Sequence, residues 1–172
     1  MLKLLGAMLI IAACTALGIK SVTKNRKTLR AITTLSDTLS EIARSINFQL
    51  DPLPDVIHRL GREQFVDEDS FINLLSSQIY TAPEKPLSEL WHNALQTFSQ
   101  THHLPQKAFS IMTDIGESIG KMDYETEIHR LTAGQKALDE LHTKMNHETA
   151  KTEKMTKSLG LILGVFIVIL LL

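Results

Sequence analysis

Two long runs without a charged residue, one near each end of the chain, constrain the fold more than any other feature. The first covers the 16 residues from Leu4 to Ile19, and the second covers the 15 residues from Ser158 to Leu172. A helix of this length is roughly 24 Å long, somewhat less than a hydrocarbon core of about 30 Å. Because flanking lysines can snorkel and a bilayer can thin locally, we expect each run to cross a membrane as a helix.

The charges beside the two runs predict an orientation. Five positive residues and no acid lie between Lys20 and Arg30, and four lysines lie between Lys144 and Lys157. Positive residues stay on the cytoplasmic side of a membrane, so we predict a hairpin with both termini outside. Its parts are transmembrane helices over residues 1–20 and 158–172 and a cytoplasmic helical bundle domain over residues 21–157.

Other interpretations of the two runs stay open. The first run would also suit a cleaved signal peptide. Residues Ile11 to Cys14 are similar to a bacterial lipobox, which would make Cys14 a lipidation site and the chain an outward-facing membrane sensor or lipoprotein. The positive charge that follows the run favours the retained helix instead. The alternative for the second run, a helix buried in a soluble core, is disfavoured because such a helix normally keeps a polar stripe.

The net charge of −1 averages over regions of opposite sign. From Ala31 to Thr143 the chain carries 8 basic and 17 acidic residues, a balance of −9, between the basic segments beside the two runs. An acidic domain repels phosphate backbones, so we expect no nucleic-acid partner. The basic segments suit an anionic leaflet, so we expect contact with membrane lipid. The acidic surface is either simply solvated or docks a basic partner.

Between the two runs, apolar residues recur at spacings of three and four, which predicts helices. No segment shows sustained alternation with a period of two, so no sheet is expected. The predicted fold is an all-α, membrane-anchored antiparallel bundle of about six helices, whose first and last helices continue into the transmembrane helices. In chain order, the predicted apolar stripes are Leu29–Ile46, Val56–Leu60, Phe71–Ile79, Leu87–Phe98, Ala108–Ile119 and Ile128–Met145.

Capping and helix-breaking residues predict where these helices begin and end. Asp51 is expected to cap the second helix, and Gly61 is expected to end it. Ser70 is the predicted cap of the third helix. Turns are predicted at Pro83–Pro86 and at His102–Pro105, because proline breaks a helix.

The last helix is predicted to be the longest. Asp123 is its expected cap, and the acids Glu125 and Glu127 are favourably placed near its positive end. No proline interrupts the helix, and no glycine lies between Gly134 and Gly160. We therefore expect it to continue without a break into the second uncharged run.

The residues offer no site for catalysis, a cofactor or a metal. His102 and His103 are adjacent, and His142 and His147 are five apart, so neither pair faces one metal ion from a helix. Cys14 is the single cysteine, and the sequence has no glycine-rich phosphate loop or nucleophile elbow. We predict a protein that is not an enzyme and takes no cofactor. An enzyme acting at the membrane would be a third hypothesis, without a candidate site.

Two glycine pairs are the candidate packing or partner contacts, together with Asp123. Gly160 and Gly164 are four apart in the second run, a spacing that lets membrane helices approach closely. We expect them to pair within the hairpin, and pairing between subunits of a homo-oligomer is the alternative. Gly116 and Gly120 lie in or just after the fifth helix, where they indicate either a tight helix contact with a cap at Gly120 or a partner surface.

Four segments occur in a set order along essentially the whole chain. They are Met1–Ala7, the break at Pro52–Pro54, the pattern Ile115-Gly116-x-x-x-Gly120-x-x-Asp123, and the approach Glu153–Gly160 to the terminal run. In this combination the chain resembles the stage III sporulation protein AB family of endospore-forming bacteria. It departs from the family pattern at Glu127, where glutamine is expected, and near His129.

This resemblance implies a location and partners that the residues alone do not give. The family is part of an eight-protein complex in the mother-cell membrane facing the forespore. Its cytoplasmic bundle is similar to one repeat of the platform protein F of type II secretion and type IV pilus systems. The expected partners are a cytoplasmic ATPase, stage III sporulation protein AA, and the other stage III sporulation membrane proteins. We therefore expect a membrane platform that docks this ATPase within a transenvelope channel during endospore formation.

Overall fold

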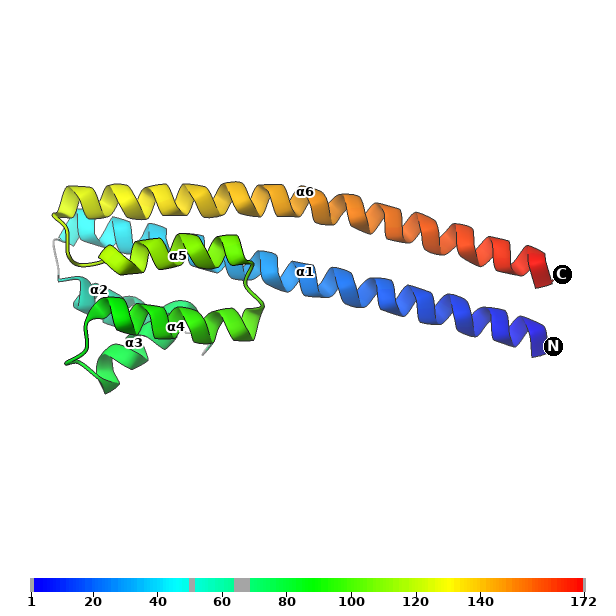
Figure 1. Cartoon of the computed structure of the whole chain (residues 1–172), viewed down its shortest axis with the longest axis horizontal. Coiled ribbons are helices and arrows are strands. Elements are labelled where there is room, and N and C mark those ends of the chain that lie inside the picture. The colour runs from blue at the N-terminus through cyan, green and yellow to red at the C-terminus, as the bar shows by residue number, and fades with distance from the viewer. Residues whose placement is uncertain (1, 50–51, 64–68, 172) are drawn as a thin grey trace. The chain divides into compact units, whose positions relative to one another are not determined.

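The computed structural model forms six α-helices and has no strand among the described residues. It describes the backbone of residues 2–49, 52–63 and 69–171, and the side chains of residues 25–48, 52–62, 69–152, 155 and 158. The helices in Figure 1 are α1 Leu2–Gln49, α2 Leu53–Glu63, α3 Phe71–Thr81, α4 Leu87–His102, α5 Gln106–Ser118 and α6 Tyr124–Leu171. The all-α bundle of six helices that the sequence predicts is confirmed.

The chain divides into two compact units. One is the continuous segment Arg30–His142, and the other combines Met1–Leu29 with Thr143–Leu172. The helices α2 to α5 lie entirely within the first unit, whereas α1 and α6 each contribute to both. Each of these two helices therefore carries one of the uncharged runs and one apolar stripe of the bundle, as the sequence predicts.

The core of the unit Arg30–His142 is built from the predicted apolar stripes. On α1, Leu35, Leu39, Ile42 and Ile46 are at most 2% exposed, and full burial of each such side chain contributes roughly 1.5–3 kcal/mol. Helix α2 packs on α3, α3 on α4, and α4 on α5. Ile72 is fully buried although it is not among the predicted inward residues of the stripe Phe71–Ile79, which are Phe71, Leu74, Leu75 and Ile79. It is buried because α3 packs against helices on two sides.

Trp91 of α4 lies at the centre of this core. Its side chain is fully buried, and its indole N–H donates a hydrogen bond of 2.8 Å to the carbonyl oxygen of Met112 on α5. The ring of Phe71 on α3 meets it edge-on, with ring centroids 4.8 Å apart. Such aromatic pairs contribute about 0.5–1.5 kcal/mol beyond the burial of their area. Trp91 thus joins three helices, and its burial agrees with its place in the predicted apolar stripe Leu87–Phe98.

Two predicted helix caps are present. The hydroxyl of Ser70 accepts a hydrogen bond of 3.4 Å from the backbone N–H of Asn73 at the start of α3. The carboxylate of Asp123 accepts a hydrogen bond of 3.0 Å from the backbone N–H of Thr126 at the start of α6. The predicted cap at Asp51 lies outside the described residues.

The predicted end of the second helix is wrong. Helix α2 continues through Gly61 to Glu63. A Cβ atom at Gly61 would lie 2.6 Å from the Cβ atom of Ser76 on α3. The glycine therefore allows α2 and α3 to approach closely, and tertiary packing outweighs its weak helix propensity.

The second unit consists of the N-terminal part of α1 and the C-terminal part of α6. These segments run in opposite directions, so the two ends of the chain lie at the same end of the unit (Figure 1). Within the part of the chain that the structure describes, no helix combines the length and apolar character needed to cross a bilayer. The side chains of the two uncharged runs, including Cys14, lie outside the described residues.

Candidate functional site

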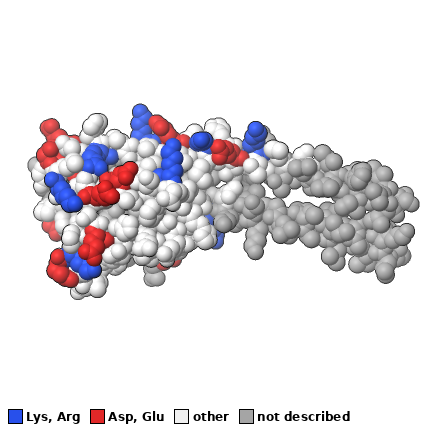
Figure 2. All heavy atoms as spheres, in the orientation of Figure 1, with Lys and Arg blue, Asp and Glu red and all other residues white. Residues whose placement is uncertain are grey.

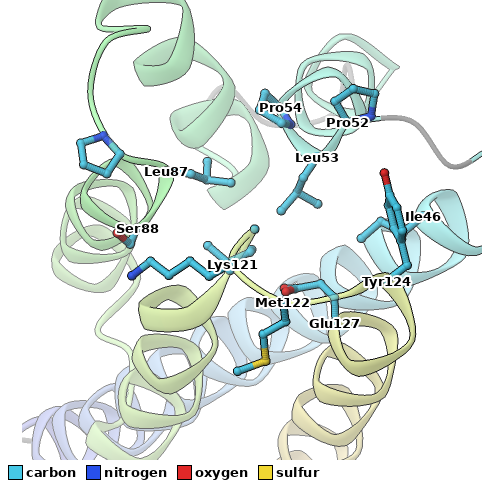
Figure 3. Close-up of a pocket in the computed structure, with 13 residues that line it drawn as sticks. Ile46, Pro52, Leu53, Pro54, Leu87, Ser88, Lys121, Met122, Tyr124 and Glu127 are labelled. Atoms are coloured by element: carbon cyan, nitrogen blue, oxygen red, sulfur yellow. The ribbon is translucent and has the colours of Figure 1, made fainter.

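A groove lies where the ends of five helices of the unit Arg30–His142 meet. It has a volume of about 550 Å³ and a mostly apolar lining. Figure 3 shows Leu53 and Leu87 facing the hollow between α2, α4 and the start of α6. The remaining lining residues are Ile46 of α1, Pro52 and Pro54 around the start of α2, Pro86 and Ser88 around the start of α4, Ile119–Met122 between α5 and α6, and Tyr124 and Glu127 of α6.

Proline residues shape two sides of the groove. Pro52 precedes α2, and its carbonyl oxygen accepts hydrogen bonds from the backbone of Asp55 and Val56 at 2.9 and 3.2 Å. Pro86 is the N-cap residue of α4. Proline suits the start of a helix because its fixed φ is helical and it has no N–H group to satisfy there. Both helices therefore start with pyrrolidine rings that add apolar surface to the groove.

Gly120 shapes a third side. Its φ is +72°, a backbone conformation that side chains strongly disfavour and glycine adopts readily. The chain leaves α5 at Ser118 and enters α6 at Tyr124 through this turn. Met122 and Tyr124 follow the turn and remain 43% and 50% exposed at the rim. The tight α5–α6 turn thus places two large side chains beside the groove.

Among the described residues, Glu127 is the one acidic residue that lines the groove, and it is only 5% exposed. Burial raises the pKa of Glu127 above its ordinary value. A hydrogen bond from the backbone N–H of Gly120 and the charge of Arg130 act in the opposite direction, and burial outweighs both. The Oε2 atom of Glu127 has no hydrogen-bond partner among the described residues.

Lys121, which lines the groove, and Arg130, whose charge acts on Glu127, both donate hydrogen bonds to other groups. Lys121 donates from Nζ to the carbonyl oxygen of Glu117 at 2.7 Å. Arg130 donates from Nη2 to the carbonyl oxygen of Asp114 at 2.7 Å, and its Nη1 lies 3.7 Å from the Sδ atom of Met122. Neither side chain forms an ion pair with Glu127 among the described residues. The groove therefore combines an apolar lining with a buried acceptor that keeps capacity for a further donor.

Three predicted contact residues lie in this region, in different environments. Gly116 is buried, because the indole of Trp91 fills the place of a side chain there, so the tight helix contact is present. Gly120 lines the groove through its turn, and the exposed Asp123 caps α6 beside it. Gly160 and Gly164 lie outside the residues whose side chains are described.

The position of Glu127 in the groove was not predicted from the sequence, because the favourable charge of an acid near the start of a helix already accounts for this residue. A signal was present in the spacing. Glu127 lies four residues before Leu131, and Leu131 and Leu138 are fully buried on α6. Residues that are four and seven positions apart share a helix face, so the stripe extends back to Glu127.

Charge on the unit Arg30–His142 does not form a single block on the face that Figure 2 presents. Acidic and basic side chains are interspersed there, with uncharged surface between them. No group of three histidine, cysteine or acidic residues is arranged to hold a metal ion in the part of the chain that the structure describes. The candidate site of this unit is the mostly apolar groove with its buried carboxyl group.

Comparison with known proteins gives a consistent result. The model of the stage III sporulation protein AB family matches residues 3–172. The stage III sporulation protein AB of Bacillus subtilis (strain 168) is 24% identical over 171 residues, which covers 99% of each chain. A solved structure titled stage III sporulation protein AB matches with a TM-score of 0.63 and 14% identity, covering 72% of this chain and 97% of that one. Because the sequence identity of this last match is low, it shows a similar fold and nothing further.

Proposed function

Because the chain belongs to the stage III sporulation protein AB family, we propose that it is a non-enzymatic membrane platform that docks a cytoplasmic ATPase during endospore formation. The carrying observation is the groove, since it offers a partner a mostly apolar surface and one buried acceptor. Apolar surface with exposed methionine and aromatic side chains is typical of protein interfaces.

The proposed location is the mother-cell membrane facing the forespore. Residues 1–20 and 158–172 would be the transmembrane helices, with both termini outside and the bundle in the cytoplasm. The uncharged runs and the basic segments beside them support this arrangement. It is also supported by the length of α1 and α6, which carry the runs and the bundle stripes in single helices.

The proposed partners are the ATPase, stage III sporulation protein AA, and other stage III sporulation membrane proteins. The sequence of this chain has no phosphate-binding loop, so nucleotide hydrolysis would come from a partner. The balance of −9 between Ala31 and Thr143 favours association with a basic surface. Membrane lipid and a second copy of the chain are further proposed contacts.

Binding to the ATPase tests this function directly. The full-length protein in lipid nanodiscs is mixed with the purified ATPase, and the complex is measured by sedimentation. We expect the wild type to bind, and replacement of both Met122 and Tyr124 by serine at the groove rim to weaken binding about tenfold or more. Replacement of the exposed Ser110 and Lys107 on α5 by alanine is the matched control. A wild-type protein that does not bind the ATPase, or normal sporulation in a deletion strain, would exclude the platform.

The outward-facing sensor or lipoprotein is the second candidate, supported by the similarity of Ile11–Cys14 to a lipobox. It predicts incorporation of labelled fatty acid that is lost in Cys14→Ser. The platform predicts no incorporation and no effect of this substitution on ATPase binding.

A further inference from the structure

We propose that the carboxyl group of Glu127 makes the groove selective for a partner segment that presents a lysine or arginine side chain beside a large apolar one. This inference rests on the proposed docking function and adds the chemistry of the docked segment. The occupant is a segment of a partner protein, bound with its apolar side chain in the groove and its cation at Glu127.

The size and lining of the groove account for the apolar part of this ligand. A volume of about 550 Å³ lies within the range of about 300–1,000 Å³ that is usual for binding pockets. Leu53, Leu87 and Ile119 supply apolar surface in its lining. Met122 and Tyr124 are 43% and 50% exposed at the rim. A partner that covers them would remove further apolar surface from contact with water, which favours binding.

The burial of Glu127 and its missing hydrogen-bond donor account for the positively charged part of this ligand. The residue is 5% exposed, yet its Oε2 atom has no hydrogen-bond partner among the described residues. A buried acceptor without a donor is unfavourable, and a buried carboxylate without a counter-charge is more so. A lysine or arginine that enters the groove would supply both a donor and a positive charge, and charge-assisted hydrogen bonds are the strong ones.

Within the described residues, Lys121 and Arg130 leave Oε2 without a donor, although the charge of Arg130 acts on the carboxyl group. The ammonium group of Lys121 is 2.7 Å from the carbonyl oxygen of Glu117, and the guanidinium of Arg130 is 2.7 Å from that of Asp114. Each lies at the C-terminal half of α5, where helix carbonyl groups attract positive charge. Both cations therefore have favourable contacts that they would lose by turning to Glu127.

The charge of the surrounding domain points to the same ligand. The segment Ala31–Thr143 has a balance of −9, so a basic segment is attracted to it and an acidic one is repelled. An uncharged apolar segment would fill the groove but would leave the buried Oε2 atom without a charged donor. The groove therefore discriminates against both acidic and purely apolar segments.

A comparison of matched peptides tests the selectivity without knowledge of the partner. Two fluorescent libraries of short peptides have leucine, isoleucine, methionine or phenylalanine beside a central residue, which is arginine in one library and its uncharged isostere citrulline in the other. Binding to the full-length protein in lipid nanodiscs is measured by anisotropy. We expect the wild type to bind the arginine library about tenfold more tightly. Equal binding of the two libraries by the wild type would overturn the proposal, without any variant.

Two variants then test whether the preference for the arginine library depends on the carboxyl group of Glu127. Glu127→Gln keeps an acceptor for the N–H of Gly120 but removes the charge, so we expect the two libraries to bind within about twofold of each other. Glu125→Gln removes an exposed charge two residues away, and we expect it to keep the wild-type preference. Thermal unfolding confirms that each variant is folded. A tenfold preference that persists in Glu127→Gln would contradict the role of this residue.

Separate outcomes distinguish this proposal from the proposed function. A wild-type protein that prefers the arginine library but does not bind the ATPase would support the selectivity and exclude that partner. If the ATPase binds the wild type and Glu127→Gln equally well, the proposed docking function is supported and the proposed selectivity of the groove is overturned. Self-association of the wild type that Glu127→Gln abolishes would assign the groove to a second copy and would also overturn the proposal.

Discussion

At the scale of single residues, Gly116 shows how one missing side chain organises a core. A Cβ atom at this position would overlap Cδ1 of Trp91 and lie 2.7 Å from its Nε1 atom. We expect Gly116→Ala to displace the indole from its hydrogen bond to Met112 and to cost about 1–3 kcal/mol, as overpacking does, despite the better helix propensity of alanine. Urea unfolding measures this change. Ser110→Ala on the exposed side of α5 is the control, and equal stability of the two variants would refute the expectation.

Glu127 makes stability depend on pH in a direction that follows from its raised pKa. The raised pKa means that this carboxyl group binds its proton more tightly in the folded than in the unfolded state. Its contribution to stability is therefore full below the unfolded pKa of about 4.3 and is lost as the pH rises through the folded pKa. We expect Glu127→Gln to be more stable than the wild type at pH 7, by about 1 kcal/mol. The difference should shrink toward pH 4 in unfolding experiments. A difference in stability between the wild type and Glu127→Gln that does not change with pH would contradict this expectation. Glu125→Gln should show the same pH dependence of stability as the wild type.

Gly116 and Glu127 also show which features of the structure could be predicted from the sequence and which could not. Apolar spacing predicts which face of a helix is buried, and the fully buried Leu35, Trp91 and Leu138 agree with it. The partner across that face is not encoded in the spacing. The contact between Gly116 and Trp91 is therefore visible only in the structure. The groove at Glu127 was likewise not predicted, since its lining comes from three stretches that are far apart in the sequence, at residues 46–54, 86–88 and 119–127.

At the scale of elements, the start of α6 depends on Asp123. The backbone N–H and the hydroxyl of Thr126 donate to its carboxylate at 3.0 and 2.9 Å, and these bonds lower the pKa of Asp123. The stabilisation is present above the unfolded pKa of about 3.9 and is lost as the pH falls through the lower folded value. We expect Asp123→Ala to lower the thermal midpoint at pH 7 and to approach the wild type in strong acid. Asp123→Asn retains an acceptor and should lose less. A variant as stable as the wild type at pH 7 would show that the cap is dispensable.

Element boundaries differ in how well local chemistry predicts them. Ser70 and Asp123 act through backbone groups three residues away, so a local pattern was enough to find both caps. Gly61 has the same local pattern as a helix end, yet α2 continues through it because Ser76 of α3 packs against it. A glycine can end a helix or allow a neighbouring helix to approach, and only tertiary packing decides between these roles.

At the scale of the whole molecule, the ordering of charge along the chain predicts its topology. The five positive residues between Lys20 and Arg30 should hold the domain of the full-length protein inside the cell. We expect a single cysteine in Ser110→Cys, on a Cys14→Ser background, to react with a membrane-impermeant maleimide only after the cells are permeabilised. If the five positive residues are replaced by glutamine, we expect the maleimide to label this cysteine in a fraction of the protein in intact cells. Labelling in intact cells without that replacement would place the domain outside and favour the sensor or lipoprotein. Because Ser110 is exposed on α5, protection of this position reports the membrane barrier and not burial in the fold.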